Sequence, residues 1–87
     1  MKIKKSYLEE IKSRLASASP GAWVSYVEGR DHTSGCNFIM TGVGGVRGQD
    51  IELSGATNSD QDFIAHARQD IEVLIKILEG NNLVDDD

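Results

Sequence analysis

The residues of this sequence with the most suitable types and spacing for chemistry are Asp62, His66 and Asp70, which recur every fourth position in D-F-I-A-H-A-R-Q-D. At that spacing, three side chains lie on one stripe of a helix. Carboxylates and an imidazole on one stripe can ligate a metal ion, or the carboxylates can orient the histidine. A solvated helix face with local ion pairs has the same pattern, and the set contains no cysteine. We therefore expect no metal site and keep this trio as a weak candidate.

A second candidate combines arginines with the glycine-rich segment G-V-G-G-V-R-G. Its members are Arg30, Arg47, Arg68, Gly44 and Gly45. Backbone amides of such a loop and a guanidinium group can hold an anion. Phosphate-binding loops open directly into a helix, whereas a strand is expected to follow this one, so a hairpin loop also explains the glycines. A small anionic ligand such as a nucleotide remains an open hypothesis.

Nucleophilic catalysis finds no support in the sequence. Cys36, the single cysteine, lies in an apolar segment with no histidine close in sequence, which predicts an inert, buried thiol. No serine lies in a nucleophile-elbow context. We therefore expect a protein that is not an enzyme and carries no cofactor.

Length and charge limit the classes of function. Eighty-seven residues suffice for one domain with one small core. The net charge of −5 disfavours binding to nucleic-acid phosphates and suits a basic protein partner. A lone cysteine, an N-terminus without an apolar run and the lack of a long apolar segment predict a protein of the cytoplasm that does not enter a membrane.

Two segments have helical periodicity. Residues 6–18 begin with a possible capping box, Ser6 with Glu9, and end before Pro20. Residues 60–79 follow a cap at Ser59 or Asp60. Apolar positions along the second segment form one stripe: Phe63, Ala67, Ile71, Leu74 and Leu78.

Three segments between the helices are expected to be strands, over residues 22–28, 36–41 and 50–54. Short connections favour an antiparallel meander, and two amphipathic helices on one sheet face give a two-layer α+β fold of order α-β-β-β-α in a single domain, 1–87. Residues 83–87 should form a frayed acidic tail. The residues expected in the core are Trp23, Phe38 or Ile39, Ile51, Leu53, Phe63, Ala67, Ile71 and Leu74.

The sheet face opposite the helices is the expected interaction surface. Val24, Tyr26 and Ile39 would lie on it and expose aromatic and β-branched side chains. A two-fold homodimer is the commonest way to bury such a patch. We therefore expect a homodimer with these residues in its interface.

Two further segments carry a resemblance. A-S-A-S-P-G-A-W, at 16–23, is similar to a helix end followed by Pro-Gly-x-Trp, and N-S-D-Q-D-F-I-A-H-A-R-Q-D-I, at 58–71, is similar to an acidic-x-x-Phe-Ile-x-x-Ala-Arg helix opening. Both resemble a family of small uncharacterised proteins of phages and prophages. Glu72 stands where that family often has a proline. The resemblance implies a fold and a phage-like origin, and no activity.

Together these expectations favour a small non-enzymatic protein-binding module encoded by a phage or mobile element. It would act as an inhibitor, an immunity-like factor or a regulatory accessory factor. An oligomeric protein that sequesters a small anionic ligand is the alternative, and a metal-dependent enzyme is a weaker one.

Overall fold

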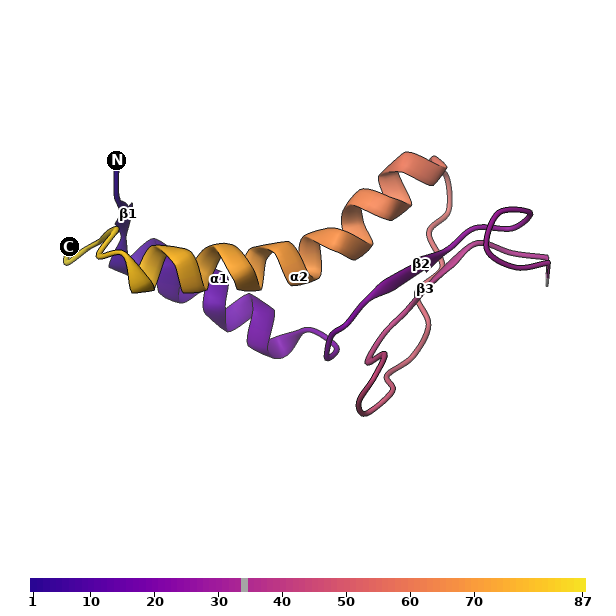
Figure 1. Cartoon of the computed structure of the whole chain (residues 1–87), viewed down its shortest axis with the longest axis horizontal. Helices are drawn as coiled ribbons and strands as arrows, with labels where there is room; N and C mark the ends of the chain where they lie inside the picture. The colour runs from indigo at the N-terminus through magenta and orange to yellow at the C-terminus, as the bar shows by residue number, and fades with distance from the viewer. Residues whose placement is uncertain (34) are drawn as a thin grey trace. The chain divides into compact units, whose positions relative to one another are not determined.

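The computed structural model describes residues 1–33 and 35–87 and contains helices and short strands (Figure 1). In chain order the elements are β1 (Ile3–Lys4), α1 (Lys5–Ser17), β2 (Val24–Tyr26), β3 (Phe38–Met40), α2 (Asn58–Gly80) and β4 (Val84–Asp85). The chain divides into two compact units. The central unit is Ser19–Gln69, and the terminal unit combines Met1–Ala18 with Asp70–Asp87. The α+β class is thus confirmed.

The central unit is built on the antiparallel pair β2–β3. Ser25 lies opposite Ile39 in this ladder. The third expected strand touches the pair at one place, where Ile39 and Ile51 exchange two backbone hydrogen bonds of 2.8 Å. Residues 50–54 therefore add a single bridge instead of a full strand, and the predicted three-stranded meander is wrong.

The N-terminal half of α2 covers one face of this pair. The Gln61 side-chain amide donates to Ser25 Oγ, 2.9 Å away, which places Ser25 on the face toward the helix. Ile39 shares that face because it is the cross-strand neighbour of Ser25. Ile39 and Ala65 are completely buried there. This contact forms the core of the central unit, together with Val27.

A reciprocal cap fixes the start of α2. The Asp60 backbone N–H donates to Thr57 Oγ1 at 3.0 Å, and the Thr57 N–H donates to the Asp60 carboxylate at 3.2 Å. This is the capping-box arrangement with aspartate in place of glutamate. The helix cap is thus Thr57 and not the expected Ser59 or Asp60, and the helix begins at Asn58.

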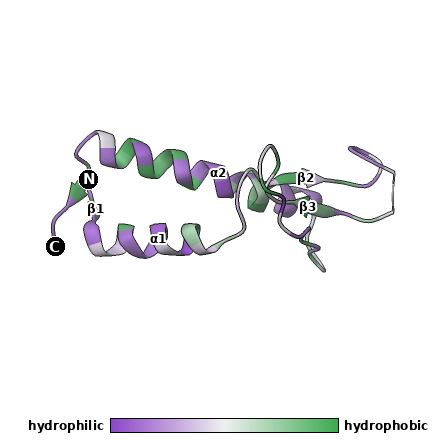
Figure 2. Cartoon of the chain, turned by 90° about the horizontal axis from the view of Figure 1, so that it is seen from below, coloured by the Kyte–Doolittle hydropathy of each residue, from purple (hydrophilic) through white to green (hydrophobic). Residues whose placement is uncertain are grey.

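The terminal unit joins both ends of the chain. β1 and β4 pair in parallel, with Ile3 opposite Val84. In this unit α1 runs beside the C-terminal half of α2, where Lys12 Nζ lies 2.9 Å from the Glu79 carboxylate (Figure 2). The predicted frayed tail instead contains β4, because Val84 can pair with the extended residues before α1.

The predicted capping box at the start of α1 is also wrong. Lys4 occupies the cap position and makes no side-chain cap. The backbone N–H and the hydroxyl of Ser6 both bond the carboxylate of Asp87. A residue at the far end of the chain thus satisfies the amide that Glu9 was expected to serve.

Burial along α2 differs from the expected pattern. Phe63, Ile71 and Leu74 are exposed instead of buried. The helix turns its Gln61 and Ala65 side toward β2 and β3, so Phe63 does not point at this pair. Of the other expected core residues, Ile39 is buried; Trp23, Phe38, Ile51, Leu53 and Ala67 are half-buried. No helix among the described residues is long and apolar enough to cross a membrane.

Candidate functional site

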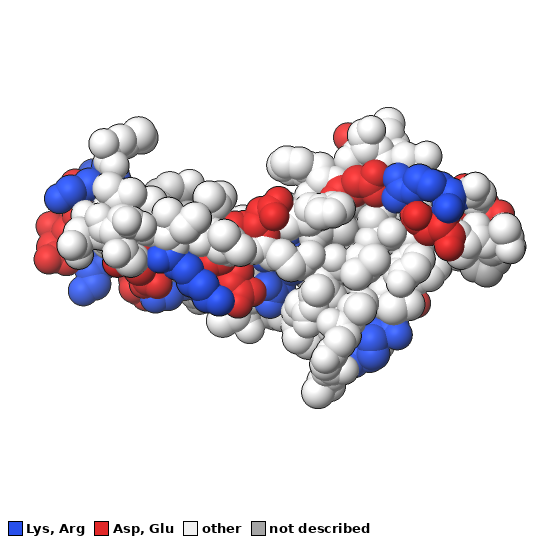
Figure 3. Space-filling view, in the orientation of Figure 1, with Lys and Arg blue, Asp and Glu red and all other residues white. Residues whose placement is uncertain are grey.

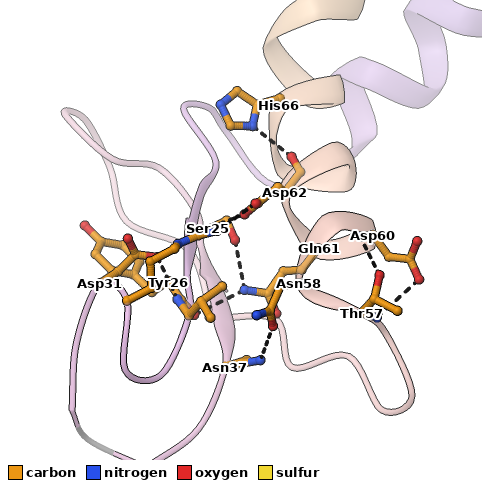
Figure 4. Close-up of polar contacts among 12 residues, drawn as sticks. Ser25, Tyr26, Asp31, Asn37, Thr57, Asn58, Asp60, Gln61, Asp62 and His66 are labelled. Carbon is orange, nitrogen blue, oxygen red and sulfur yellow. Dashed lines mark hydrogen bonds and ion pairs between the residues drawn. The ribbon is translucent and has the colours of Figure 1, made fainter.

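The first feature of the candidate site is the side chain of Phe63, which is 75% exposed in the central unit. The burial of Gln61, two residues earlier on α2, explains this exposure. Gln61 is only 2% exposed, and its amide lies near Ser25 and Tyr26 (Figure 4). It also reaches the carbonyl oxygens of Tyr26 and Phe38, each at 3.2 Å. Three hydrogen-bond acceptors therefore fix the rotation of α2 about its axis, and Phe63 points into solvent.

A polar pocket lies between β2 and the N-terminal half of α2, on the same unit. Its volume is about 390 Å³. The residues that line it are Trp23, Val24, Ser25, Arg30, Asp31, Asp62, His66 and Gln69. Gln69 bonds the backbone of the residue before β2, since its amide group accepts from the Trp23 N–H and donates to the Trp23 carbonyl, both at 2.9 Å. Gln69 of α2 therefore forms one side of the pocket.

A bidentate ion pair closes one wall of this pocket. The two terminal nitrogens of Arg30 donate to the two carboxylate oxygens of Asp62, at 2.8 and 2.9 Å. Nε of Arg30 also donates to Asp31 at 3.0 Å. This fork-to-fork geometry is the most specific that an arginine and a carboxylate can form. It ties the turn after β2 to the first turns of α2.

The ion pair shifts the pKa values of the residues that form it. The hydrogen bonds from Arg30 and Ser25 hold the pKa of the Asp62 carboxyl well below its usual range. Bonds to Asp62 and Asp31 raise the pKa of the Arg30 guanidinium. Hydrogen bonds from Arg30 and from the Val27 backbone N–H likewise lower the pKa of Asp31. All three groups are charged at neutral pH, and the cluster carries one net negative charge.

His66 lies one turn after Asp62. Its Nδ1 is 2.8 Å from the backbone carbonyl of Asp62, so Nδ1 carries a proton and donates (Figure 4). The Asp62 carboxylate faces Arg30 and does not orient the imidazole. Among the residues that the structure describes, no three His, Cys, Asp or Glu side chains are placed to hold a metal ion. The candidate trio Asp62, His66 and Asp70 is thus not assembled as a ligand set.

The anion-binding candidates are distributed over different places. Arg30 lines the pocket, but Arg47 and Arg68 do not. Arg47 donates to the Thr41 carbonyl at 2.9 Å and to Asp50 at 2.8 Å. Nε of Arg68 donates to the Ser19 carbonyl at 3.3 Å.

The glycine-rich loop closes on itself. The Arg47 contacts anchor the segment containing Gly44 and Gly45, and Gly42 adopts a left-handed φ of 65°. A Cβ at Gly42 would lie 2.0 Å from the Val46 carbonyl oxygen, so only glycine fits there. A tight hairpin connection therefore explains the glycine at this position.

The predicted interaction surface on the open sheet face is only partly formed. Ile39 was expected on the open sheet face with Val24 and Tyr26, but it lies on the opposite, buried face. The ladder register explains this, since Ile39 pairs with Ser25 and Tyr26 pairs with Phe38. Tyr26 is half-buried and stacks on Phe38 with ring centroids 5.3 Å apart.

The thiol of Cys36 is exposed instead of buried. It lies 3.9 Å from a carboxylate oxygen of Glu52 in a second open pocket. Cys36 precedes β3 and is not part of its ladder, so the apolar surroundings expected for this residue are absent.

The exposed apolar side chains of α2 are functional candidates, and the hydropathy pattern assigned three of them, Phe63, Ile71 and Leu74, to the core. In the central unit they are Phe63 and Ile64, and in the terminal unit they are Ile71, Val73, Leu74 and Ile77. The sequence signal for this outcome is the pair Gln61 and Gln69, which lie about two helical turns apart. Their amides bond Ser25 and Trp23, in and just before β2.

Comparisons of this chain with protein-family models, curated proteins and solved structures gave no match.

Proposed function

We propose that this chain is a small non-enzymatic protein-binding module and that Phe63 is the anchor of its docking surface. Interface energy concentrates in a few aromatic anchors that enter a pocket of the partner. A phenyl ring that is 75% exposed on a capped helix fits this role. The helix cannot turn to bury the ring without breaking the three contacts of Gln61. The exposure of Phe63 is the observation that carries the proposal.

Charge identifies the kind of partner. Residues 19–69 contain six acidic and three basic side chains, a net charge of −3. Asp60 lies one turn before Phe63 on the same helix, and its carboxylate is exposed. Complementary potentials speed encounter and fix the orientation of docking. The partner is therefore a protein with an apolar pocket surrounded by Lys and Arg.

Such a module can inhibit or regulate by covering a basic functional surface of its partner. This mode agrees with an inhibitor, an immunity-like factor or a regulatory accessory factor of a phage or mobile element acting in the cytoplasm. The ion pair of Arg30 with Asp62 supports the same role, since it fixes the first turns of α2 from which Phe63 projects.

The test begins with a photo-crosslinking phenylalanine analogue at position 63 in cells that express the chain. The crosslinked partner protein is identified by mass spectrometry and produced recombinantly. Its binding to the wild type, Phe63→Ala and Val46→Ala is then measured by titration. Val46 is the control because it is 82% exposed in a loop of the same unit. We expect Phe63→Ala to weaken binding at least tenfold, or about 1.4 kcal/mol, and Val46→Ala to leave it unchanged.

Added salt should weaken the complex, because a rim of opposite charges is screened by ions. Equal affinity of wild type and Phe63→Ala would overturn the proposal. An adduct that contains only a second copy of this chain would also overturn it, because the surface would then be a self-contact.

A further inference from the structure

The terminal unit buries few apolar side chains. It consists of 36 residues in two segments, all of which the structure describes. Of these, only Leu8 and Ile75 are buried, at 1% and 7% exposure. Structures of fewer than about 40 residues usually need a disulfide, a metal or a second subunit. The one cysteine of the chain lies in the other unit, so no disulfide can form within this one.

The same unit exposes enough apolar side chains to form a second core. They are Tyr7 of α1 and Ile71, Val73, Leu74 and Ile77 of α2, and each is between 38% and 57% exposed. Ile71, Leu74 and Ile77 follow one another at helical intervals of three residues, which places them along one side of α2. A side of this kind packs naturally against a second helix.

The charges of the terminal unit favour a second copy of the chain as the molecule that covers this apolar side of α2. Residues 1–18 contain five basic and two acidic side chains, a net charge of +3, and residues 70–87 contain one basic and six acidic side chains, a net charge of −5. Figure 3 shows basic and acidic side chains on the visible face of this unit. Within one copy the opposite charges already pair, as in Lys12 with Glu79 and Lys2 with Asp85.

A two-fold axis brings the same surface of each copy together. Each copy then offers both a basic segment, residues 1–18, and an acidic one, residues 70–87, so attraction between copies offsets the repulsion expected from the net charge of −5. Five partly exposed apolar side chains from each copy supply the apolar centre of an interface, and the charged residues supply its rim.

We propose that the chain forms a homodimer through the C-terminal half of α2, with Leu74 at the centre of the contact. The surface is different from the face of Val24 and Tyr26 that the sequence suggested, and it is independent of the partner that docks on Phe63. The dimer completes the core of the terminal unit.

Sedimentation equilibrium of the wild type, Leu74→Lys and Val46→Lys tests this proposal. Val46→Lys is the matched control, because it places the same charge on an exposed aliphatic residue of the central unit. We expect the wild type and Val46→Lys to have about twice the mass of the 9.5 kDa chain, and Leu74→Lys to have the mass of one chain. A wild type that stays monomeric up to millimolar concentration would overturn the dimer. A Leu74→Lys chain that dimerises like the wild type would overturn the surface.

Leu74→Lys can also unfold the terminal unit, because that unit depends on the dimer for its core. A second chain therefore carries Ile77→Cys with Cys36→Ser and is treated with a short bismaleimide. Rapid linkage of two copies through position 77 supports the contact. An unlinked chain at a concentration where the mass shows a dimer excludes it.

Discussion

Gln61 and Phe63 are two residues apart on α2 and have opposite environments, since Gln61 is 2% exposed and Phe63 is 75% exposed. Two residues correspond to a rotation of about 200° around a helix, so burying one side chain exposes the other. The amide of Gln61 bonds Ser25 and the carbonyls of Tyr26 and Phe38. The polar residue therefore determines which side of the helix contacts the sheet, and the aromatic residue remains available for binding.

The first prediction concerns Gln61. Gln61→Leu keeps the approximate volume but removes the donor that bonds Ser25 and the carbonyls of Tyr26 and Phe38. The net contribution of an intramolecular hydrogen bond is about 0.5–1.5 kcal/mol of folding free energy. We expect urea unfolding followed by circular dichroism to show a loss in that range. Gln49→Leu is the control, because the Gln49 side chain is exposed; equal effects of the two changes would contradict the role assigned to Gln61.

The second prediction separates exposed from buried apolar residues. Phe63→Ala should change the free energy of unfolding by less than about 0.5 kcal/mol, as exposed substitutions do. Leu8→Ala should cost about 2–5 kcal/mol, because Leu8 is 1% exposed. Thermal unfolding of both variants measures the contrast. A large loss in Phe63→Ala would place that ring in a core.

The cap of α2 gives the third prediction. Thr57→Ala removes the oxygen that accepts from the Asp60 N–H, and the loss of such a cap costs about 1 kcal/mol. Ser59→Ala is the matched control within the first turn of the helix. Chemical unfolding of the two variants measures the difference. Similar losses in both would show that Thr57 is not the cap.

The fourth prediction follows from the lowered pKa of Asp62. A carboxyl whose pKa is depressed in the folded state contributes stability above its unfolded pKa of about 3.9, and this contribution is lost as pH falls below that value. The melting temperature of the wild type should therefore fall on acidification below pH 4. In Asp62→Asn the fall should be shallower, because the Arg30 contact no longer titrates.

The control for this experiment is Asp86→Asn, since Asp86 is exposed in the C-terminal segment. It should show the same acid response as the wild type. If Asp62→Asn and Asp86→Asn have the same pH profile, the ion pair of Asp62 with Arg30 does not couple protonation to folding.

The periodicity of the sequence predicts the two helices well, because both the apolar spacing and the flanking breakers are local properties of the chain. The segments 6–18 and 60–79 correspond to α1 and α2 within two residues at each end. Hydropathy could not predict which side of α2 is buried. That choice depends on hydrogen bonds from Gln61 to Ser25 and from Gln69 to Trp23, which are distant in sequence.

The strands, too, could be predicted only in part from the sequence. The alternation D-I-E-L-S predicts a third strand, but the structure uses only Ile51 for a bridge. Val84 instead pairs with Ile3 across the length of the chain, which no local pattern indicates. The candidate site was likewise found only in part. The sequence singled out Arg30, Asp62 and His66, but not the exposure of Phe63 on which the proposed function depends.

The dimer through α2 is the central claim, and intermolecular NOEs measure it most directly. Isotope-labelled and unlabelled chains are mixed, and isotope-filtered spectra select contacts between copies. The account predicts NOEs from the methyl groups of Ile71, Leu74 and Ile77 of one copy to those of the other. NOEs confined to Val24 and Tyr26, or no intermolecular NOEs at a concentration where the wild type is a dimer, would contradict it.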